Sequence, residues 1–236
     1  MYDLIRPWRT SVGSKFLMAL TGLGLTLFVI VHMLGNLLVF AGRDALNSYA
    51  HMLKENGELL WLFRGGLLTI FVVHVYLGIT LTLDNKAARP VPYAREDTVQ
   101  ASWASRHMML TGLVLLAFIV YHLAHFTFGW VQKTSEGTSY LEVKDYSMDP
   151  AHPRADVYAM VVAGFQNPYI TASYVVAMVF LWLHLWHGGS SWFQSLGLNH
   201  PRYWGVMQYI GPVIATVVLV GNCSIPLAIL AGYEPK

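Results

Sequence analysis

The sequence predicts an all-α protein, a polytopic membrane bundle of five transmembrane helices formed as one domain over residues 1–236. Hydrophobic residues make up 55% of the chain and charged residues only 12%, which is about half the charged fraction of an ordinary soluble domain. The charges collect in short connecting segments and leave long apolar runs between them. Eight tryptophans and thirteen tyrosines suit the aromatic belts at membrane interfaces. The net charge of +2 is too small to indicate a nucleic-acid partner.

Five apolar runs are long enough to cross a bilayer, which takes about 20 helical residues. In chain order they cover about residues 14–40, 59–83, 105–130, 168–196 and 204–231. The first run is too long for the core of a cleavable signal peptide, so we expect it to be retained as a helix. Asn167-Pro168 favours a helix start at the fourth run, because proline suits the first helical turn. Residues 197–201, Gly-Leu-Asn-His-Pro, predict the turn before the fifth.

The basic residues that flank the helices favour a cytoplasmic N-terminus and an outer C-terminus, in the cytoplasmic (inner) cell membrane. With that orientation the cytoplasmic side carries eight Lys and Arg residues and the outer side seven. Three of the seven lie in one long segment, residues 131–167, and long translocated segments count little toward orientation. We expect this outer segment to be either a polar cap over helix ends or a lid over a ligand site.

Each of the first four apolar runs contains one histidine of particular interest: His32, His74, His122 and His184. An ionisable residue inside the membrane is costly and is therefore functional by default. Imidazole is a common axial ligand of haem iron, so four such residues are enough to hold two haems. The alternative is four buried histidines that hydrogen-bond to the backbone or to one another.

Counting from the helix ends pairs these histidines by depth. His32 and His122, the outer pair, each lie eight residues before the outer end of their runs. His74 and His184, the inner pair, lie nine and twelve residues before the inner ends of theirs. Glycines four residues after each member of the inner pair, Gly78 and Gly188, would either leave room for a flat macrocycle or serve close helix packing.

Further histidines compete for these roles. His125 and His187 each follow a candidate ligand by three residues, and we expect them to hydrogen-bond or to contact a haem propionate. The others, which lie in connecting segments or at helix ends, are expected to be solvated or interfacial: His51, His107, His152 and His200.

Cys223 is the only cysteine, which excludes a covalently attached haem and an iron–sulfur cluster held by this chain alone. The sequence also contains no glycine-rich nucleotide fingerprint after a strand. Flavin or iron–sulfur chemistry would therefore belong to partner subunits.

The segments around the four histidines read F-V-I-V-H-M-L-G-N-L, F-V-V-H-V-Y-L-G-I, T-G-L-V-L-L-A-F-I-V-Y-H-L-A-H-F and F-L-W-L-H-L-W-H-G-G-S-S-W-F-Q-S-L-G. In order and context they resemble the cytochrome b subunit of succinate dehydrogenase and fumarate reductase, in the five-helix form that carries two b haems. The resemblance covers essentially the whole chain, including the 42-residue step from His32 to His74 and the Thr111-Gly112 pair. It implies ligation of one haem by the first and third histidines and of the other by the second and fourth, and it favours His122 over His125 and His184 over His187.

The resemblance further implies an electron-transfer anchor of the respiratory chain and tricarboxylic acid cycle. The chain would hold a flavoprotein subunit, which carries the dicarboxylate chemistry, and an iron–sulfur subunit at the cytoplasmic face. Electrons would pass through the two haems to or from a membrane quinone, with menaquinone favoured, near the outer haem. The whole complex could form an oligomer. The long outer segment does not map onto the family pattern.

Charged side chains near the helix ends are candidates for two further roles. The basic residues Arg9, Lys15, Arg106 and Arg202 would hold the partner subunit and the inner haem propionates, or act only as topology signals. Glu55 and Glu58 are candidates for a quinone site by position alone, and are otherwise helix-start residues.

Two other functions are compatible with the histidines. One is the cytochrome b anchor of another respiratory dehydrogenase, such as a formate dehydrogenase or hydrogenase, which one histidine on each of four successive helices disfavours. The other is a transporter that uses buried histidines as a proton relay and binds no haem.

Overall fold

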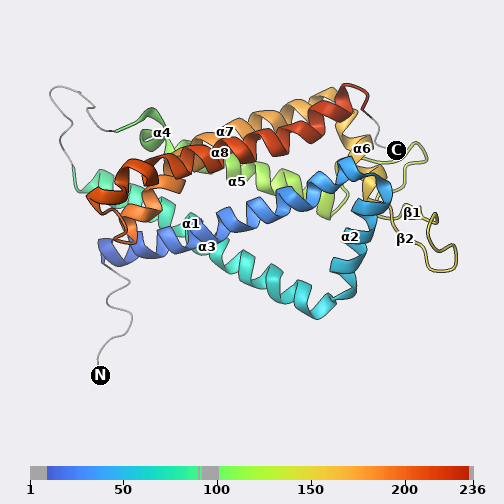
Figure 1. Ribbon diagram of the computed structural model, residues 1–236, viewed down its shortest axis with the longest axis horizontal. Helices are drawn as coiled ribbons and strands as arrows, with labels where there is room; N and C mark the ends of the chain where they lie inside the picture. The colour runs from blue at the N-terminus through green and yellow to red at the C-terminus, as the bar shows by residue number, and fades with distance from the viewer. Residues whose placement is uncertain (1–9, 90, 92–100, 234–236) are drawn as a thin grey trace. The chain divides into compact units, whose positions relative to one another are not determined.

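Long helices dominate the fold (Figure 1). The computed structural model describes residues 10–89, 91 and 101–233. Five helices are long and apolar enough to cross a membrane. They are α1 (Ser11–Asn36) with the 3₁₀ turn η2 (Leu37–Ala41), α3 (Gly57–Ala87), α5 (Met108–His122) with the π-helical turn η3 (Leu123–Thr127), α7 (Pro168–Ser195) and α8 (Pro201–Leu230). The predicted all-α, multi-pass membrane architecture is confirmed.

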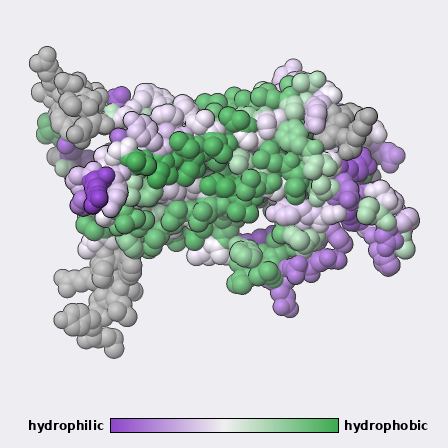
Figure 2. Space-filling view, viewed as in Figure 1, coloured by the Kyte–Doolittle hydropathy of each residue, from purple (hydrophilic) through white to green (hydrophobic). Residues whose placement is uncertain are grey.

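The shorter elements lie between these spans. They are α2 (Arg43–Glu55), α4 (Trp103–Arg106), β1 (Lys144–Asp145), β2 (Arg154–Ala155) and α6 (Val157–Phe165). The two strands pair antiparallel, with Asp145 opposite Arg154. Figure 2 shows hydrophobic residues over the long helices and hydrophilic residues gathered over α2 and the segment that contains the strands. Exposed apolar side chains on the long helices, such as Leu62 and Val206, suit contact with lipid rather than water.

Helix boundaries follow local chemistry. Helices α7 and α8 both begin at a proline, which lacks the N–H that the first turn cannot satisfy. After α7 the chain turns at Gly197, whose φ of +76° is a left-handed conformation that glycine adopts readily. The expected third span, 105–130, differs most from the structure: α4 is separate from it, and the α-helix ends at His122, where a π-helical turn begins.

Contacts divide the chain into two compact units, and every long helix contributes residues to both. Unit 1 comprises Met1–Val29, Gly65–Leu113 and Leu181–Val217. Unit 2 comprises Ile30–Arg64, Val114–Phe180 and Val218–Lys236.

In unit 1 the backbones of α7 and α8 approach closely at two glycines. A β-carbon at Gly189 would lie 2.8 Å from the Cα atom of Gly211, so a side chain there would force the helices apart. The hydroxyl of Ser190 donates to the carbonyl of Gln208 at 3.0 Å, which adds a hydrogen bond between the same helices. Small residues at such crossings are typical of membrane helix packing.

In unit 2 the outer segment folds onto α2 through a buried polar network. Arg154 lies 2.9 Å from the carboxylate of Asp145 and 2.6 Å from that of Asp44. Asn47 is fully buried, and its amide nitrogen donates to Asp145 at 2.9 Å and to Asp156 at 3.1 Å. Residues 131–167 therefore form an ordered cap on α2. The side chains that hold it are far apart in sequence: Asn47 and Asp145 are separated by 98 positions.

The cap carries its charges in an ionised, paired state. Burial opposes ionisation of the Asp145 carboxyl, but hydrogen bonds from Ser147 and Asn47 outweigh it and hold its pKa well below the usual range. Burial also disfavours the charged form of Arg154, yet its bonds to Asp44 and Asp145 raise the pKa of the guanidinium. A buried carboxylate that lost this partner would be left with an uncompensated charge.

Replacing Arg154 by methionine should loosen the cap, because Asp145 stays buried and loses its cation. Breaking a buried ion pair costs about 3–5 kcal/mol, so hydrogen exchange over residues 141–160 of the purified protein should rise sharply. Lys133→Met removes an exposed cation from the same segment and is the matched control. Equal exchange in the two variants would mean that the network does not hold the cap.

Candidate functional site

Two histidine pairs meet between the long helices, one in each unit; His32 is exposed, and His74, His122 and His184 are half-buried. In unit 1 the rings of His74 and His184 lie 6.3 Å apart between centroids. In unit 2 the rings of His32 and His122 lie 5.8 Å apart. The structure thus brings together the inner pair and the outer pair as depth counting expects, and the ring contacts are made by His122 and His184 themselves.

A threonine from α1 fixes the orientation of His74. The Nδ1 atom of His74 lies 3.1 Å from the hydroxyl oxygen of Thr21, and that hydroxyl donates its proton to the carbonyl of Leu17 at 2.9 Å. A hydroxyl has only one proton to donate, so its oxygen accepts from an Nδ1–H of the imidazole. This arrangement favours the proton on Nδ1 and the lone pair on Nε2, which is the atom that can bind a metal.

The same arrangement recurs at His184. Its Nδ1 atom lies 3.1 Å from the hydroxyl oxygen of Thr111 on α5, and this hydroxyl donates to the carbonyl of Met108 at 3.0 Å. Both inner histidines are thus held by a neighbouring helix in the tautomer that leaves Nε2 available for a ligand.

A glycine follows each of these threonines and lets the helix approach the imidazole. A β-carbon at Gly22 would lie 3.3 Å from Cε1 of His74, and one at Gly112 would lie 3.6 Å from Cε1 of His184. Methionine side chains lie beside the other two glycines. A β-carbon at Gly78 would lie 3.7 Å from Cε of Met18, and one at Gly188 would lie 3.9 Å from Cε of Met108.

The sequence contains a signal for these contacts that the histidine count overlooked. Residues 18–32 and 108–122 share Met, Thr, Gly and His at the same four relative positions: Met18, Thr21, Gly22 and His32, and Met108, Thr111, Gly112 and His122. Each copy holds one inner histidine and contributes one outer histidine. This internal repeat identifies the two threonines as site residues.

In the outer pair, His122 belongs to a longer series of hydrogen bonds. The Nδ1 atom of His122 lies 3.4 Å from the phenol oxygen of Tyr174, which lies 2.9 Å from Nδ1 of His125. Nε2 of His125 then lies 3.0 Å from the Oε1 atom of Gln132. His125 is fully buried in the π-helical turn and hydrogen-bonds through both ring nitrogens, which is the kind of role expected for it. Sequence analysis did not single out Tyr174 or Gln132.

The remaining candidates lie at the periphery. Arg106 and Arg202 are exposed and belong to the same unit as the inner pair, and Arg202 lies over the ring of Tyr203 at 5.9 Å. Lys15 is exposed, and Arg9 lies outside the described residues. His187 is half-buried, one turn after His184.

The acidic candidates and the other histidines face solvent or the interface. Glu55 pairs with His51 at 3.2 Å, and Glu58 lies exposed in the first turn of α3, as helix-start residues do. His107 stacks on Trp103 with ring centroids 4.1 Å apart, and His152 pairs with Asp149 at 2.9 Å. His200 is exposed.

One buried donor in unit 1 has no acceptor among the described residues. The indole nitrogen of Trp192, on α7 after His184, is buried without a hydrogen-bond partner. An indole N–H can only donate, so leaving it unpaired is costly. It is the one buried side-chain nitrogen or oxygen without a hydrogen-bond partner among the described residues.

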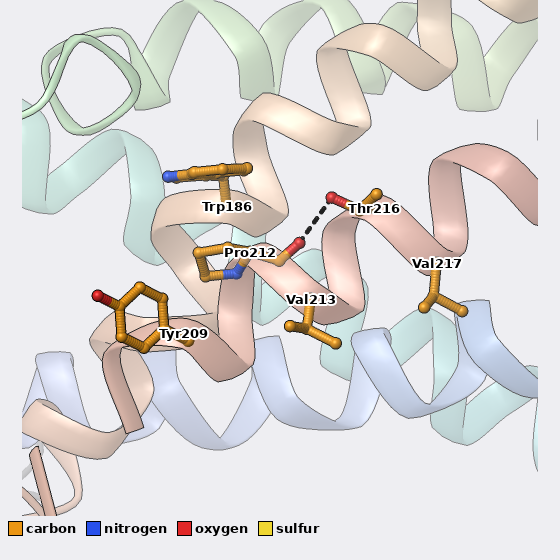
Figure 3. Close-up of a pocket in the computed structure, with 6 residues that line it drawn as sticks. All are labelled: Trp186, Tyr209, Pro212, Val213, Thr216 and Val217. Atoms are coloured by element: carbon orange, nitrogen blue, oxygen red, sulfur yellow. Dashed lines mark hydrogen bonds between the residues drawn. The ribbon is translucent and has the colours of Figure 1, made fainter. Parts of the chain in front are cut away.

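An open apolar groove of about 310 Å³ lies on α7 and α8 within unit 1 (Figure 3). Trp186 comes from α7, and the other lining residues are Tyr209, Pro212, Val213, Thr216 and Val217 of α8. The hydroxyl of Thr216 donates to the carbonyl of Pro212 at 2.9 Å within its own helix. The groove therefore offers an apolar surface with few polar groups free to bind a ligand.

The geometry of each pair fits one iron between two imidazoles. Histidine–metal bonds are about 2.0 Å long, so two imidazoles on opposite sides of one ion have ring centroids on the order of 6 Å apart. The described residues contain no group of three or more His, Cys, Asp or Glu side chains that could hold a metal ion. A haem iron needs only two protein ligands, because the porphyrin supplies four nitrogens.

Comparison of the chain with protein-family models, with curated proteins and with solved structures gives no match.

Replacing Thr111 or Thr21 by valine should destabilise the protein and release the tautomer of the facing histidine. Each change leaves a half-buried imidazole N–H without its acceptor, which costs about 1–3 kcal/mol where the group is fully buried and less here. Thermal unfolding measures the loss, and the ¹⁵N shifts of the ring nitrogens report the tautomer. Thr69→Val, at an exposed hydroxyl that bonds within its own helix, is the matched control. Unchanged ring shifts in both variants would contradict the assignment.

Proposed function

We propose that this chain is the membrane-anchor cytochrome b subunit of a succinate:quinone oxidoreductase, a succinate dehydrogenase or fumarate reductase, and that it binds two b haems. The observation that carries the proposal is the pair of His–His contacts at 6.3 and 5.8 Å, each within one compact unit. The threonines behind the inner pair support it, because they leave Nε2 of His74 and His184 free to bind iron.

Bound haem would supply a one-electron carrier, and the chain's own residues would bind, orient and shield it. Nε2 of His32 and His122 would bind one iron, and Nε2 of His74 and His184 the other. The apolar helices around the half-buried His74, His122 and His184 would limit the access of water to these ligands, whereas His32 is exposed. With two imidazole ligands on each iron, no coordination position is left for substrate, so the site suits electron transfer rather than substrate chemistry.

The residues around the inner pair also suit haem propionates. Trp192 supplies a buried N–H that lacks an acceptor, and Arg106 and Arg202 in the same unit supply cations. A carboxylate from the inner haem would satisfy the indole and pair with a guanidinium. This is consistent with an inner pair near the cytoplasmic face, where basic residues are favoured.

In this proposal the N-terminus lies in the cytoplasm and the chain sits in the inner cell membrane. A flavoprotein subunit oxidises succinate or reduces fumarate, and an iron–sulfur subunit exchanges electrons with the inner haem. The outer haem exchanges electrons with a quinone, with menaquinone favoured. The quinone potential then decides the direction of the reaction.

Haem content tests the proposal directly. The complex purified with this chain should give two haems per chain by pyridine haemochrome assay and should contain flavoprotein and iron–sulfur subunits. A value near zero would overturn the proposal and favour a histidine-relay transporter. Two haems with other dehydrogenase partners would identify a different respiratory complex, and a value near one would contradict the double pairing.

Single histidine replacements should sort into two spectral classes. His32→Ala and His122→Ala should remove the same haem component, whereas His74→Ala and His184→Ala should remove the other, because each iron loses one of its two axial ligands. Reduced-minus-oxidised spectra and redox titration measure the components. His51→Ala, at an exposed histidine, should leave both intact. If His32→Ala and His74→Ala removed the same component, the pairing would be wrong.

A further inference from the structure

We propose that Tyr174 is a positioning residue for the axial ligand His122, and that Gln132 of the outer segment sets the direction of its hydrogen bond through His125. The proposal rests on the proposed function, since it concerns the electronic character of a haem ligand. It assigns a role to the cap formed by residues 131–167, which would act on the outer haem through a chain of hydrogen bonds.

The hydrogen bonds that link Gln132 to His122 form a series, and the donor in each of them follows from the bond that Gln132 makes. The amide nitrogen of Gln132 donates to the carbonyl of Met160 in α6 at 3.0 Å, which fixes the orientation of the amide. Its Oε1 atom can then only accept, so Nε2 of His125 is the donor across 3.0 Å. The other nitrogen of a neutral His125, Nδ1, is therefore an acceptor.

The same logic continues to the haem ligand. Because Nδ1 of His125 accepts, the phenol of Tyr174 donates its single proton to it across 2.9 Å. The phenol oxygen is left as an acceptor, and it receives Nδ1–H of His122 across 3.4 Å. His122 is thereby held with the proton on Nδ1 and the lone pair on Nε2, the atom that would bind iron.

Packing keeps the phenol in place. Tyr174 is buried, with 6% of its surface exposed, and it sits against both histidines with ring centroids 5.9 Å from His122 and 5.7 Å from His125. Phe118 and Phe165 pack edge-on against its ring, each at 5.0 Å. The π-helical turn that contains His125 is a rare geometry, often found at functional sites.

The outer ligand His122 and the inner ligands His74 and His184 differ in the groups that accept a hydrogen bond from Nδ1. Thr21 and Thr111 pass their protons to carbonyls of their own helices, so the hold on each inner histidine is local. The hydrogen bonds from His122 run through Tyr174 and His125 to Gln132 of the cap. An acceptor at Nδ1 increases the electron donation of an imidazole to its metal, which stabilises the oxidised iron. The cap would therefore lower the potential of the outer haem selectively.

The test is a redox titration of both haems in the purified complex, followed optically and by electron paramagnetic resonance. Tyr174→Phe removes the acceptor and keeps the ring, so the potential of the outer haem should rise while that of the inner haem stays constant. Thr111→Val is the matched variant for the inner pair and should shift only the inner haem. An unchanged outer potential in Tyr174→Phe would overturn the proposal.

Two variants at Gln132 test the same series of hydrogen bonds at a residue that does not contact the ligand. They test the proposal even if Tyr174→Phe fails to bind the outer haem. Gln132→Leu leaves Nε2–H of His125 without an acceptor. That favours the opposite tautomer of His125, whose Nδ1–H then competes with Nδ1–H of His122 for the phenol oxygen and weakens that bond. Gln132→Glu keeps an oxygen acceptor. The outer potential should rise in Gln132→Leu and remain at or below the wild-type value in Gln132→Glu.

Equal shifts in the two Gln132 variants would indicate lost packing rather than hydrogen-bond direction, and would overturn the inference. Wild-type protein without haem would overturn the proposed function instead. If the protein binds two haems and their potentials are unchanged in the Tyr174 and Gln132 variants, this inference is excluded and the proposed function is unaffected.

Discussion

An imidazole inside an apolar helix needs a defined partner at each of its two nitrogens, and the arrangement of this protein depends on that requirement. Water is not available at this depth to satisfy a stray N–H, and a misdirected proton would block the ligand atom. In each pair the sequence provides a hydroxyl at Nδ1: Thr21 for His74, Thr111 for His184 and Tyr174 for His122. The helices that carry these hydroxyls are thereby fixed in register against the histidines.

The internal repeat shows how one short sequence serves both pairs. In α1 and again in α5, a threonine and a glycine hold an inner histidine, and a histidine eleven residues later joins the outer pair. Eleven helical residues make about three turns at 3.6 residues per turn, so both features lie on nearly the same helix face. The helix backbone approaches the imidazole most closely at Gly22, where a β-carbon would lie 3.3 Å from Cε1 of His74 and the ring would have to shift slightly; at Gly112 the corresponding distance to His184 is 3.6 Å, an ordinary contact.

Much of this could be predicted from the sequence, for identifiable reasons. Five spans follow from uninterrupted apolar runs, and the pairs follow from depth, because helix rise converts sequence position into height. The third span was expected to run without a break from 105 to 130, because apolar composition does not reveal the cap at Ser102 or the π-helical turn after His122.

The residues that complete the site were harder to predict. Tyr174 and Gln132 come from separate segments, and their proximity to His125 is tertiary. The network joining Asn47 to Asp145 and Asp156 is equally non-local. In the proposed function all four iron ligands would be histidines, so the coordination alone would give the two irons the same donor set. Hydrogen bonds to the ligands would then be one source of a difference between the two haems. Those hydrogen bonds do differ: a threonine bonded within its own helix stands behind each inner ligand, and a buried phenol linked to the cap stands behind His122. In the proposed function this asymmetry would set the potentials of the two haems apart, and it would lie in residues that do not touch the iron.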